Sequence, residues 1–360
     1  MKKDYKNILI IKMSSLGDII HALPSLYVLR KAYPKSRITW AVHPSFAGIL
    51  PGKPWIDEIY LVDRKRIRQL SYLREVHHDL KARHFDLVID LQMIAKSGII
   101  SFLSGCSERI GYQDGREGSF LASRPISGPH KKGHIIEQLL DVMRYLGCDV
   151  SEIEFPIHDY KKELSQVKDL LQKEGIVGPY VVLVPGTRGE QKKWPLSYWG
   201  ELASSLSDRG IYNVISGTAG EMDMGNRIKD MSPSPCTVNL MGRTSLLQLA
   251  ALERLASLHI SSDTGPLHIA NAVHTPLIAL FGPTLPDRSG PYGNPDSYVI
   301  MADHPGTKEC RMDTIPVEKV LKKALDILES DIEDHHGTYY QPEQPVDQMC
   351  SPSEAEKMER

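Results

Sequence analysis

The sequence of 360 residues has little cysteine and little net charge. Its five cysteines are scattered, and no two form a Cys-x-x-Cys pair: Cys106, Cys148, Cys236, Cys310 and Cys350. We therefore expect neither a disulfide framework nor a structural zinc site, and we expect a reducing compartment. The formal net charge of −2 gives no overall reason to expect binding to nucleic acid.

Long hydrophobic runs are also missing. No apolar run approaches the roughly 20 residues that a membrane span needs. Near the N-terminus the apolar run Ile8–Ile11 follows basic residues, but it is too short for a signal peptide and charge returns at Lys12. These absences lead us to expect a cytoplasmic protein.

Short strand-like runs alternate with segments of helical periodicity along most of the chain. The predicted strands are Asn7–Lys12, Arg37–His43, Glu58–Val62, Phe85–Leu91, Tyr180–Val184, Tyr212–Ser216, Thr237–Leu240, Leu258–Ser261, Leu277–Phe281 and Tyr298–Met301. The predicted helices are Ile19–Lys31, Ile135–Leu146, Glu163–Glu174, Tyr198–Leu206, Leu246–Leu255 and Pro316–Leu328. Several strands are continuous Val/Ile/Leu runs, as parallel strands buried on both faces should be. The alternation predicts doubly wound α/β sheets.

The length exceeds what one hydrophobic core usually supports, so we expect two domains. The boundary is predicted between Asp149 and Gly178, which gives an N-terminal domain over residues 1–160 and a C-terminal domain over residues 161–330. The helix over residues 316–328 is expected to brace the hinge. Residues 331–360 are polar and lack apolar periodicity, so they are predicted to be a disordered tail.

The segment from Ser261 to Ala270 is the most informative stretch of the chain. It follows an apolar run, carries Asp263 and His268, and contains a Gly-Pro turn, which is typical of a strand end followed by a helix start. The first turn of a helix offers unpaired N–H groups and the positive end of a dipole, which suit a phosphate. Open α/β sheets bind ligands at the carboxyl ends of their strands, so the segment is predicted to belong to a ligand site.

The loop after the first predicted strand carries a single carboxylate. Gly17 permits a tight turn, and Asp18 falls in the first turn of the helix that follows. A carboxylate at this position either caps the helix or acts as a general base at the edge of a cleft. The loop has no Gly-x-Gly-x-x-Gly pattern, which disfavours a nicotinamide dehydrogenase.

Three loops of the second half combine glycine with polar side chains. The loop Val184–Pro195 suits a diphosphate through its threonine and its cations, or is simply a solvated charged loop. The loop Ser216–Glu221 ends in a carboxylate that suits ribose hydroxyls or begins a helix. In the loop Leu240–Leu246, Thr244 or Ser245 is expected to cap a helix, a role compatible with backbone contacts to a base.

Basic residues accumulate in the first half. Arg64 and Arg68 follow a predicted strand, Arg116 lies in a glycine-rich loop, and Lys96 follows Asp90-Leu91-Gln92 at another strand end. Charges of this kind usually form a solvated face. They also suit an anionic acceptor, because the guanidinium fork matches phosphate and carboxylate groups.

Taken together, these motifs resemble the lipopolysaccharide core heptosyltransferases of glycosyltransferase family nine. The matching segments are Lys12–Asp18, His21–Pro24, Asp90–Gln92 with Lys96 and Ser97, Lys192–Pro195, Ser262–His268 and Phe281–Thr284. The resemblance covers the chain from Asn7 to Leu328. It implies an α/β GT-B fold, in which two doubly wound Rossmann-like domains face a central cleft.

The resemblance implies ADP-L-glycero-D-manno-heptose as the donor, bound by the C-terminal domain. In this pattern Lys192 neutralises the leaving diphosphate and Asp263 holds heptose hydroxyls, because a carboxylate aimed at phosphate would repel it. The other implied donor-binding residues are Thr187, Glu221, Thr244, Thr264, Gly265 and His268. Some members have Thr-Thr-Arg where this chain has Gly186-Thr187-Arg188, a departure that removes one hydroxyl from the loop.

The implied acceptor is a lipid A-linked inner-core glycolipid bound by the N-terminal domain. Asp18 resembles the base that deprotonates the acceptor hydroxyl. The residues implied in acceptor binding are Ser15, Arg64, Arg68, Lys96 and Arg116. We expect a monomer in peripheral contact with the inner membrane, where basic loops meet anionic head groups.

The implied reaction is an in-line displacement that inverts the anomeric carbon. No resident cofactor or metal cluster is expected, because the acids are spread singly over different loops; magnesium on the diphosphate stays an alternative. Two other functions stay open: a related transferase that modifies a protein or another glycan, and a non-catalytic nucleotide-sugar-binding protein. The sequence does not decide which heptose is added.

Overall fold

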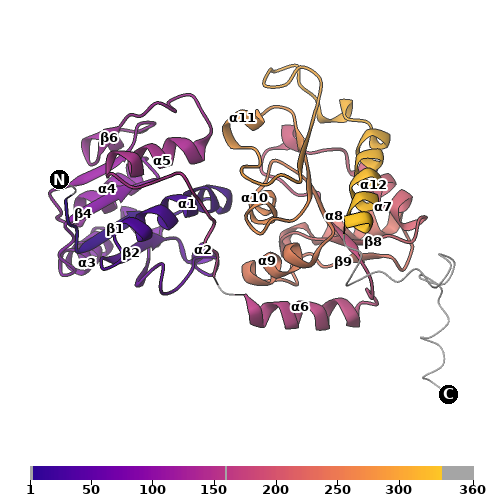
Figure 1. The fold of residues 1–360 in the computed structure, drawn as a ribbon, viewed down its shortest axis with the longest axis horizontal. Coiled ribbons are helices and arrows are strands. Elements are labelled where there is room, and N and C mark those ends of the chain that lie inside the picture. The colour runs from indigo at the N-terminus through magenta and orange to yellow at the C-terminus, as the bar shows by residue number, and fades with distance from the viewer. Residues whose placement is uncertain (1–2, 159, 335–360) are drawn as a thin grey trace. The chain divides into compact units, whose positions relative to one another are not determined.

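The computed structural model describes residues 3–158 and 160–334. The chain divides into two compact units, Met1–Asp159 with Asp287–Ser289, and Tyr160–Pro286 with Gly290–Arg360. Each unit contains a six-stranded sheet surrounded by helices (Figure 1). All the paired strands in both sheets are parallel.

The first unit is built from the earlier part of the chain. Its strands are β1 (Asn7–Ile11), β2 (Arg37–Val42), β3 (Glu58–Leu61), β4 (Leu87–Asp90), β5 (Arg109–Tyr112) and β6 (Arg124–Ile126). Its helices are α1 (Leu16–Ala32), α2 (Pro44–Ala47), α3 (Leu70–Lys81), α4 (Ala95–Leu103) and α5 (Ile135–Tyr145), with 3₁₀ turns η1 (Arg66–Arg68) and η2 (Ser119–Leu121).

The second unit repeats this architecture. Its strands are β7 (Tyr180–Val184), β8 (Tyr212–Ile215), β9 (Thr237–Asn239), β10 (Leu258–Ser262), β11 (Leu277–Phe281) and β12 (Ser297–Met301). Its helices are α6 (Lys161–Lys173), α7 (Leu196–Ser207), α8 (Met222–Met231), α9 (Leu246–Leu255), α10 (Gly265–Ala272) and α12 (Val317–Asp334). Its 3₁₀ turns are η3 (Glu190–Lys192), η4 (Ala219–Glu221) and η5 (Met312–Thr314), and α11 (Pro286–Ser289) crosses the division between the units.

Both sheets have the strand order of a Rossmann fold. The first runs β3-β2-β1-β4-β5-β6, and the second, read from its other edge, runs β9-β8-β7-β10-β11-β12. In each sheet the connections leave in opposite directions from the central pair, β1 with β4 and β7 with β10. Ligands of such folds bind outside the carboxyl ends of this pair, so the loops after these four strands are where a site is expected.

The predicted α/β class with two doubly wound sheets is confirmed. Two strands and three longer helices were not predicted: β5, β6, α3, α4 and α8. Strand β5 contains Gly111 and β6 contains Pro125, two residue types that interrupt the apolar pattern of a strand. Helix α12 extends to Asp334, so four residues assigned to the tail are helical. The rest of the predicted tail, residues 335–360, lies outside the described residues.

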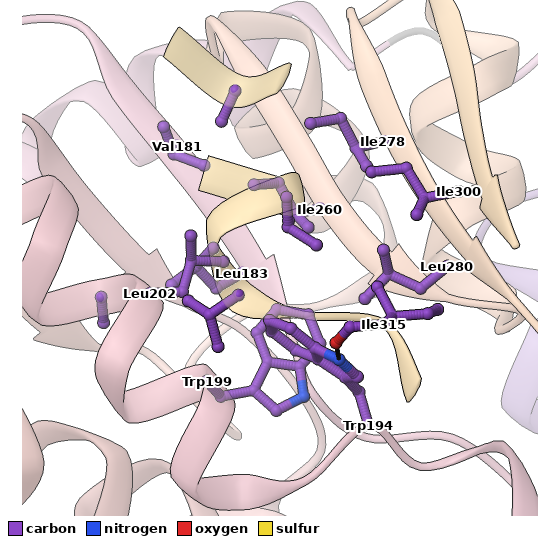
Figure 2. Packing of buried hydrophobic residues seen from close by; sticks show 14 of the residues in the cluster. Val181, Leu183, Trp194, Trp199, Leu202, Ile260, Ile278, Leu280, Ile300 and Ile315 are labelled. Carbon is purple, nitrogen blue, oxygen red and sulfur yellow. Dashed lines mark hydrogen bonds between the residues drawn. The ribbon is translucent and has the colours of Figure 1, made fainter. Parts of the chain in front are cut away.

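The core of the second unit explains how its loops are held (Figure 2). Side chains of β7, β10 and β11 pack with Trp194 and Trp199, whose rings meet edge to face at 5.0 Å between centroids. The Trp194 indole donates to the carbonyl of Ile315 over 2.9 Å. Helix α12 adds a stripe at helical spacing, including Val320 and Ala324, and packs on α7. Trp194 thus anchors the loop that carries Lys192 two residues earlier.

Candidate active site

The loop after β1 places Asp18 in the first turn of α1. Its Oδ2 accepts hydrogen bonds from the backbone N–H of Ser15, over 2.8 Å, and from the Ser15 hydroxyl, over 2.6 Å. Ser15 is the N-cap residue, so the carboxylate and the cap hold each other in a reciprocal capping box. The capping interpretation is therefore confirmed. Asp18 remains partly exposed, so the same carboxylate is reachable from solvent.

A hydrogen-bond network fixes the backbone that precedes Asp18. The side-chain oxygen of Gln92 accepts from the backbone N–H groups of Met13, over 3.0 Å, and Ser14, over 3.1 Å. Gln92 is itself held because Asp90 Oδ1 accepts its backbone N–H over 3.0 Å and that of Met93 over 2.9 Å. The strand-end motif after β4 therefore shapes the loop after β1, which is its neighbour in the sheet.

Lys12 lies beneath this loop and is almost fully buried. Its ammonium group donates to the Leu91 carbonyl over 2.7 Å and lies 5.9 Å from the centre of the Tyr112 ring. Burial lowers the pKa of Lys12, and the nearby carboxylates of Asp18 and Asp90 oppose that effect. Burial also raises the pKa of Asp90 to about 6. Each buried group favours the charged form of the other, although they make no direct ion pair.

Of the predicted acceptor residues, Ser15 lies in this loop and Arg64 contacts it. Arg64 Nη1 donates to the Ser14 hydroxyl over 2.6 Å. Arg116 is exposed, and its backbone N–H donates to the Met93 carbonyl over 3.0 Å, which places it beside the end of β4. Lys96 lies in the first turn of α4. Arg68 is exposed on η1 and makes no side-chain hydrogen bond with the described residues.

In the second unit the structure joins the loops after β7 and β10. The Lys192 ammonium lies 2.6 Å from Asp263 Oδ2, with both side chains largely buried. The Thr187 hydroxyl donates to the Asp263 carbonyl over 2.8 Å, and the Thr284 hydroxyl donates to Asp263 Oδ2 over 2.8 Å. The Asp263 carboxylate therefore fixes the Lys192 ammonium beside the ends of β7 and β10.

The N-terminus of α10 follows immediately. Thr264 is the N-cap residue, Gly265 is the first residue of the helix, and Pro266 is among its first two. The buried His268 places Nε2 3.8 Å from Asp263 Oδ1. The predicted donor residues Thr187, Lys192, Asp263, Thr264, Gly265 and His268 are thus gathered at the carboxyl ends of the central strand pair.

The Glu221 carboxylate lies at the neighbouring strand end. Its Oε2 accepts from the backbone N–H of Thr218, over 2.8 Å, and from the Thr218 hydroxyl, over 2.6 Å. A side chain at Gly186 would overlap the Glu221 carboxylate. Glycine, which stands at position 186 in place of the first threonine of Thr-Thr-Arg, therefore leaves the space that the Glu221 carboxylate fills.

The loop after β9 packs against this strand end. Gly242 has a φ of +73° and donates to the Gly217 carbonyl over 2.9 Å. Thr244 follows two residues later and is partly buried. Ser245 rather than Thr244 caps α9, accepting from the backbone N–H of Gln248 over 3.2 Å.

Three polar residues of the site were not among the predicted ones. Gln92 and Ser14 belong to the segments that carried the family resemblance, and Thr284 ends the Phe281–Thr284 segment. Each of these three residues lies near the end of a strand, and this position was the only sign of a role in the site. The position does not reveal which loop a side chain contacts. Among the residues that the structure describes, no three His, Cys, Asp or Glu side chains gather as a metal site.

The fold and these sites define the class of the protein. Two Rossmann-like units with polar residues at both switch points match the GT-B architecture of glycosyltransferases. The chain belongs to glycosyltransferase family 9 (heptosyltransferase), whose model matches residues 73–320. It is 27% identical over 313 residues to a lipopolysaccharide core heptosyltransferase, OpsX, of Haemophilus influenzae, covering 84% of this chain and 87% of that protein.

Solved structures agree with this assignment. A glycosyltransferase family 9 protein of Veillonella parvula superposes with a TM-score of 0.81 at 24% identity, over 92% of this chain and 99% of that one. The Escherichia coli heptosyltransferase WaaC with ADP superposes with a TM-score of 0.73 at 25% identity, over 89% of this chain and 99% of that one. The similarity therefore spans both units.

Proposed function

We propose that this heptosyltransferase transfers L-glycero-D-manno-heptose from ADP-heptose to the inner core of lipopolysaccharide, with inversion at the anomeric carbon. The observation that carries the proposal is the arrangement of Lys192, Asp263 and the start of α10 at the switch point of the second sheet. The relatives support the chemistry: one acts on the lipopolysaccharide core by its name, and one was solved with ADP.

The second unit supplies what a departing diphosphate needs. Negative charge gathers on ADP as the glycosidic bond breaks, and the Lys192 ammonium with the α10 N–H groups would stabilise that charge. Asp263 would then turn to the heptose hydroxyls, because its charge opposes that of the phosphates. In this proposal the protein needs no resident cofactor, since a side chain and a helix start provide the positive charge.

The first unit supplies the base. Asp18 would accept the proton of the attacking acceptor hydroxyl, and its hydrogen bonds to Ser15 orient the carboxylate before substrate arrives. Arg64, Arg116 and Lys96 would bind the anionic sugars and phosphates of the acceptor. Attack on one face while ADP leaves from the other inverts the configuration.

The chemistry of the two substrates also suggests a location. A nucleotide sugar is dissolved in water, whereas lipid A is anchored in a bilayer, so the enzyme would work at the cytoplasmic face of the inner membrane. No helix among the described residues has the length and apolar content of a membrane span. We therefore propose peripheral contact with the membrane.

Two measurements test the proposal together. ADP-heptose, but not UDP-glucose, should raise the melting temperature, and mass spectrometry should show one added heptose on a core glycolipid carrying zero, one or two heptoses. The acceptor that gains the mass of one heptose identifies which heptose of the inner core this enzyme adds. Thermal stabilisation without product on any core acceptor, but with product on a protein or another glycan, would overturn the acceptor assignment. No stabilisation by ADP-heptose would overturn the donor assignment.

A further inference from the structure

Exposed apolar side chains are concentrated on one face of the first unit. Of the eleven large hydrophobic side chains that are exposed among the described residues, five lie on or beside α4, η2 and the end of α5. Leu121 is 83% exposed, Phe102 65% and Phe120 55%, and Ile99 and Tyr145 accompany them. Exposed hydrophobics scattered singly need no explanation, but a cluster of this kind marks an interaction surface.

The cluster is one continuous surface. Helix α4 and η2 pack closely, because a Cβ at Gly98 would lie only 3.3 Å from Ala122 Cβ. Arg109 donates from Nε to the Ala122 carbonyl over 2.7 Å while its guanidinium lies 5.8 Å from the centre of the Phe102 ring. A shallow depression of about 500 Å³ continues the surface, lined in part by Phe120 and Leu121. We call this surface the α4–η2 face and define it by Ile99, Phe102, Phe120, Leu121, Arg109 and Arg124.

The charges of the α4–η2 face are positive. Arg109 and Arg124 both line the depression, and Arg124 lies 5.1 Å from the centre of the Tyr145 ring. The carboxylate that also lines it, Glu108, is paired with Lys3 and accepts a hydrogen bond from Tyr5 over 2.6 Å. Between residues 95 and 133 the sequence has six Lys and Arg but only three Asp and Glu.

An apolar surface flanked by arginines fits a partner that is apolar and negatively charged at once. A bilayer with anionic head groups has both properties: phenyl and leucyl side chains enter its interfacial region while arginine side chains stay at the phosphates. We propose that the α4–η2 face docks on an anionic lipid bilayer and holds this unit at the membrane surface.

The position of the face in the sequence is consistent with the acceptor. Arg116 and Phe120 are four residues apart, so they are separated by no more than about 14 Å even in a fully extended chain. Docking through Phe120 and Leu121 would keep Arg116 near the head groups, where the inner-core sugars of a lipid-anchored acceptor begin. This link to the acceptor rests on the function proposed above, whereas the docking itself does not.

Vesicle flotation tests the docking directly. The full chain should bind vesicles of phosphatidylglycerol and phosphatidylethanolamine and bind vesicles of phosphatidylcholine much more weakly, with the difference shrinking at high salt. Leu121→Ser should lower the partition coefficient on anionic vesicles about fivefold, and Phe120→Ser/Leu121→Ser about thirtyfold.

Val177→Ser provides a matched control, because Val177 is an aliphatic side chain 78% exposed on the second unit. This variant should bind vesicles like the wild type. Equal binding by the wild type and Phe120→Ser/Leu121→Ser, or an equal loss in Val177→Ser, would overturn the proposal. So would a change in the sedimentation mass of Phe120→Ser/Leu121→Ser without vesicles, because it would assign the face to a second protein copy.

Transfer to a deacylated core acceptor, measured without vesicles, separates this proposal from the proposed function. Phe120→Ser/Leu121→Ser should keep the wild-type rate with that acceptor and lose rate only with the lipid-anchored acceptor in vesicles. If the wild type transfers nothing to either acceptor, the proposed function fails while flotation still decides the docking. If Phe120→Ser/Leu121→Ser loses rate equally with both acceptors, the α4–η2 face does not act by docking on the membrane, and the proposal is overturned.

Discussion

The two sheets share a strand order, but their switch points are built differently. In the first unit the loop that carries Asp18 is supported by the partly buried Gln92, which accepts from its backbone, and by the buried Lys12. In the second unit the polar groups face each other at the strand ends, where Lys192 is paired with Asp263. The loop of the first site is fixed by hydrogen bonds to its backbone, whereas the second site is fixed by an ion pair between two side chains.

This difference matches the different tasks we propose. A base gains from a fixed orientation, because proton transfer depends on geometry that is set before the substrate arrives. A cation that is to receive a diphosphate gains from a partner that holds it in position and can be exchanged for phosphate. The internal support of the first site and the exchangeable pair of the second lead to separate expectations for their variants.

Asp18→Asn should abolish most transfer, because an amide keeps hydrogen-bond acceptors for Ser15 but cannot take a proton. We expect kcat to fall by a factor of about 10²–10⁴, with ADP-heptose affinity unchanged. Steady-state kinetics and calorimetric donor binding measure the two effects. Asp223→Asn, which changes an exposed acid in the first turn of α8, should leave both unchanged. Unimpaired transfer by Asp18→Asn would remove Asp18 from the base role.

Lys192→Met should impair both donor binding and turnover. Losing one preorganised charge that stabilises a leaving group lowers kcat by a factor of about 10²–10³. The variant also leaves the Asp263 carboxylate without its cation beside the incoming phosphates. The adjacent Lys193→Met is a matched control, because Lys193 pairs with the exposed Glu190 at 2.8 Å and should be dispensable. Equal kinetics in the two variants would show that Lys192 has no special role.

Gln92→Ala should slow transfer through the shape of the loop before Asp18. The Met13 and Ser14 N–H groups lose their common acceptor, so we expect kcat to fall about tenfold while the KM for ADP-heptose stays constant. Gln92→Glu retains an acceptor oxygen and should restore most of the rate. Gln113→Ala, at the end of the neighbouring β5, is the control. A rise in the KM for the acceptor without loss of kcat would instead make Gln92 a substrate contact.

Asp263→Asn should bind ADP more tightly than the wild type, because the carboxylate that competes for Lys192 and repels phosphate is gone. We expect the Kd for ADP to fall about threefold to tenfold while turnover of ADP-heptose decreases. Isothermal titration with ADP alone measures the first effect, and the exposed Asp303→Asn serves as the reference. Weaker ADP binding would assign Asp263 to the diphosphate rather than to the sugar.

Asp90→Asn should change how stability depends on pH. Because the folded pKa of Asp90 is raised to about 6, above its unfolded value, the folded state binds more protons between about pH 4 and pH 6. As the pH rises from about 4 to 6, the unfolding free energy of the wild type relative to that of the variant should therefore fall by on the order of 2 kcal/mol. Above pH 6 this difference should level off. Denaturant unfolding at several pH values measures it. A relative stability that rises over this range would contradict the raised pKa.

The fold was most predictable where a strand is a continuous apolar run. All six strands of the second sheet were predicted, and Leu277–Phe281 shows such a run, which is buried along its whole length. In the first sheet β5 and β6 were missed. Strand β6 has three residues, pairs on one side only and contains Pro125, so its existence depends on the strand beside it rather than on its own sequence.

The candidate site was predictable to the level of loops. Small polar motifs after strong strands pointed to the loops that contain Asp18, Lys192 and Asp263. The partners of these residues were not identified in the same way. The bond between Gln92 and the backbone of Met13 joins positions 79 residues apart, and only the pairing of β1 with β4 brings them together.

Local patterns of apolar, glycine and polar residues encode the alternation of strand and helix, the family and the loops of the candidate site, so these could be predicted from the chain alone. Folding in three dimensions brings particular loops together, pairs Lys192 with Asp263 and places Phe102, Phe120 and Leu121 on one exposed face. Such contacts join residues far apart in the chain, and strand order and packing, rather than local preference, determine them.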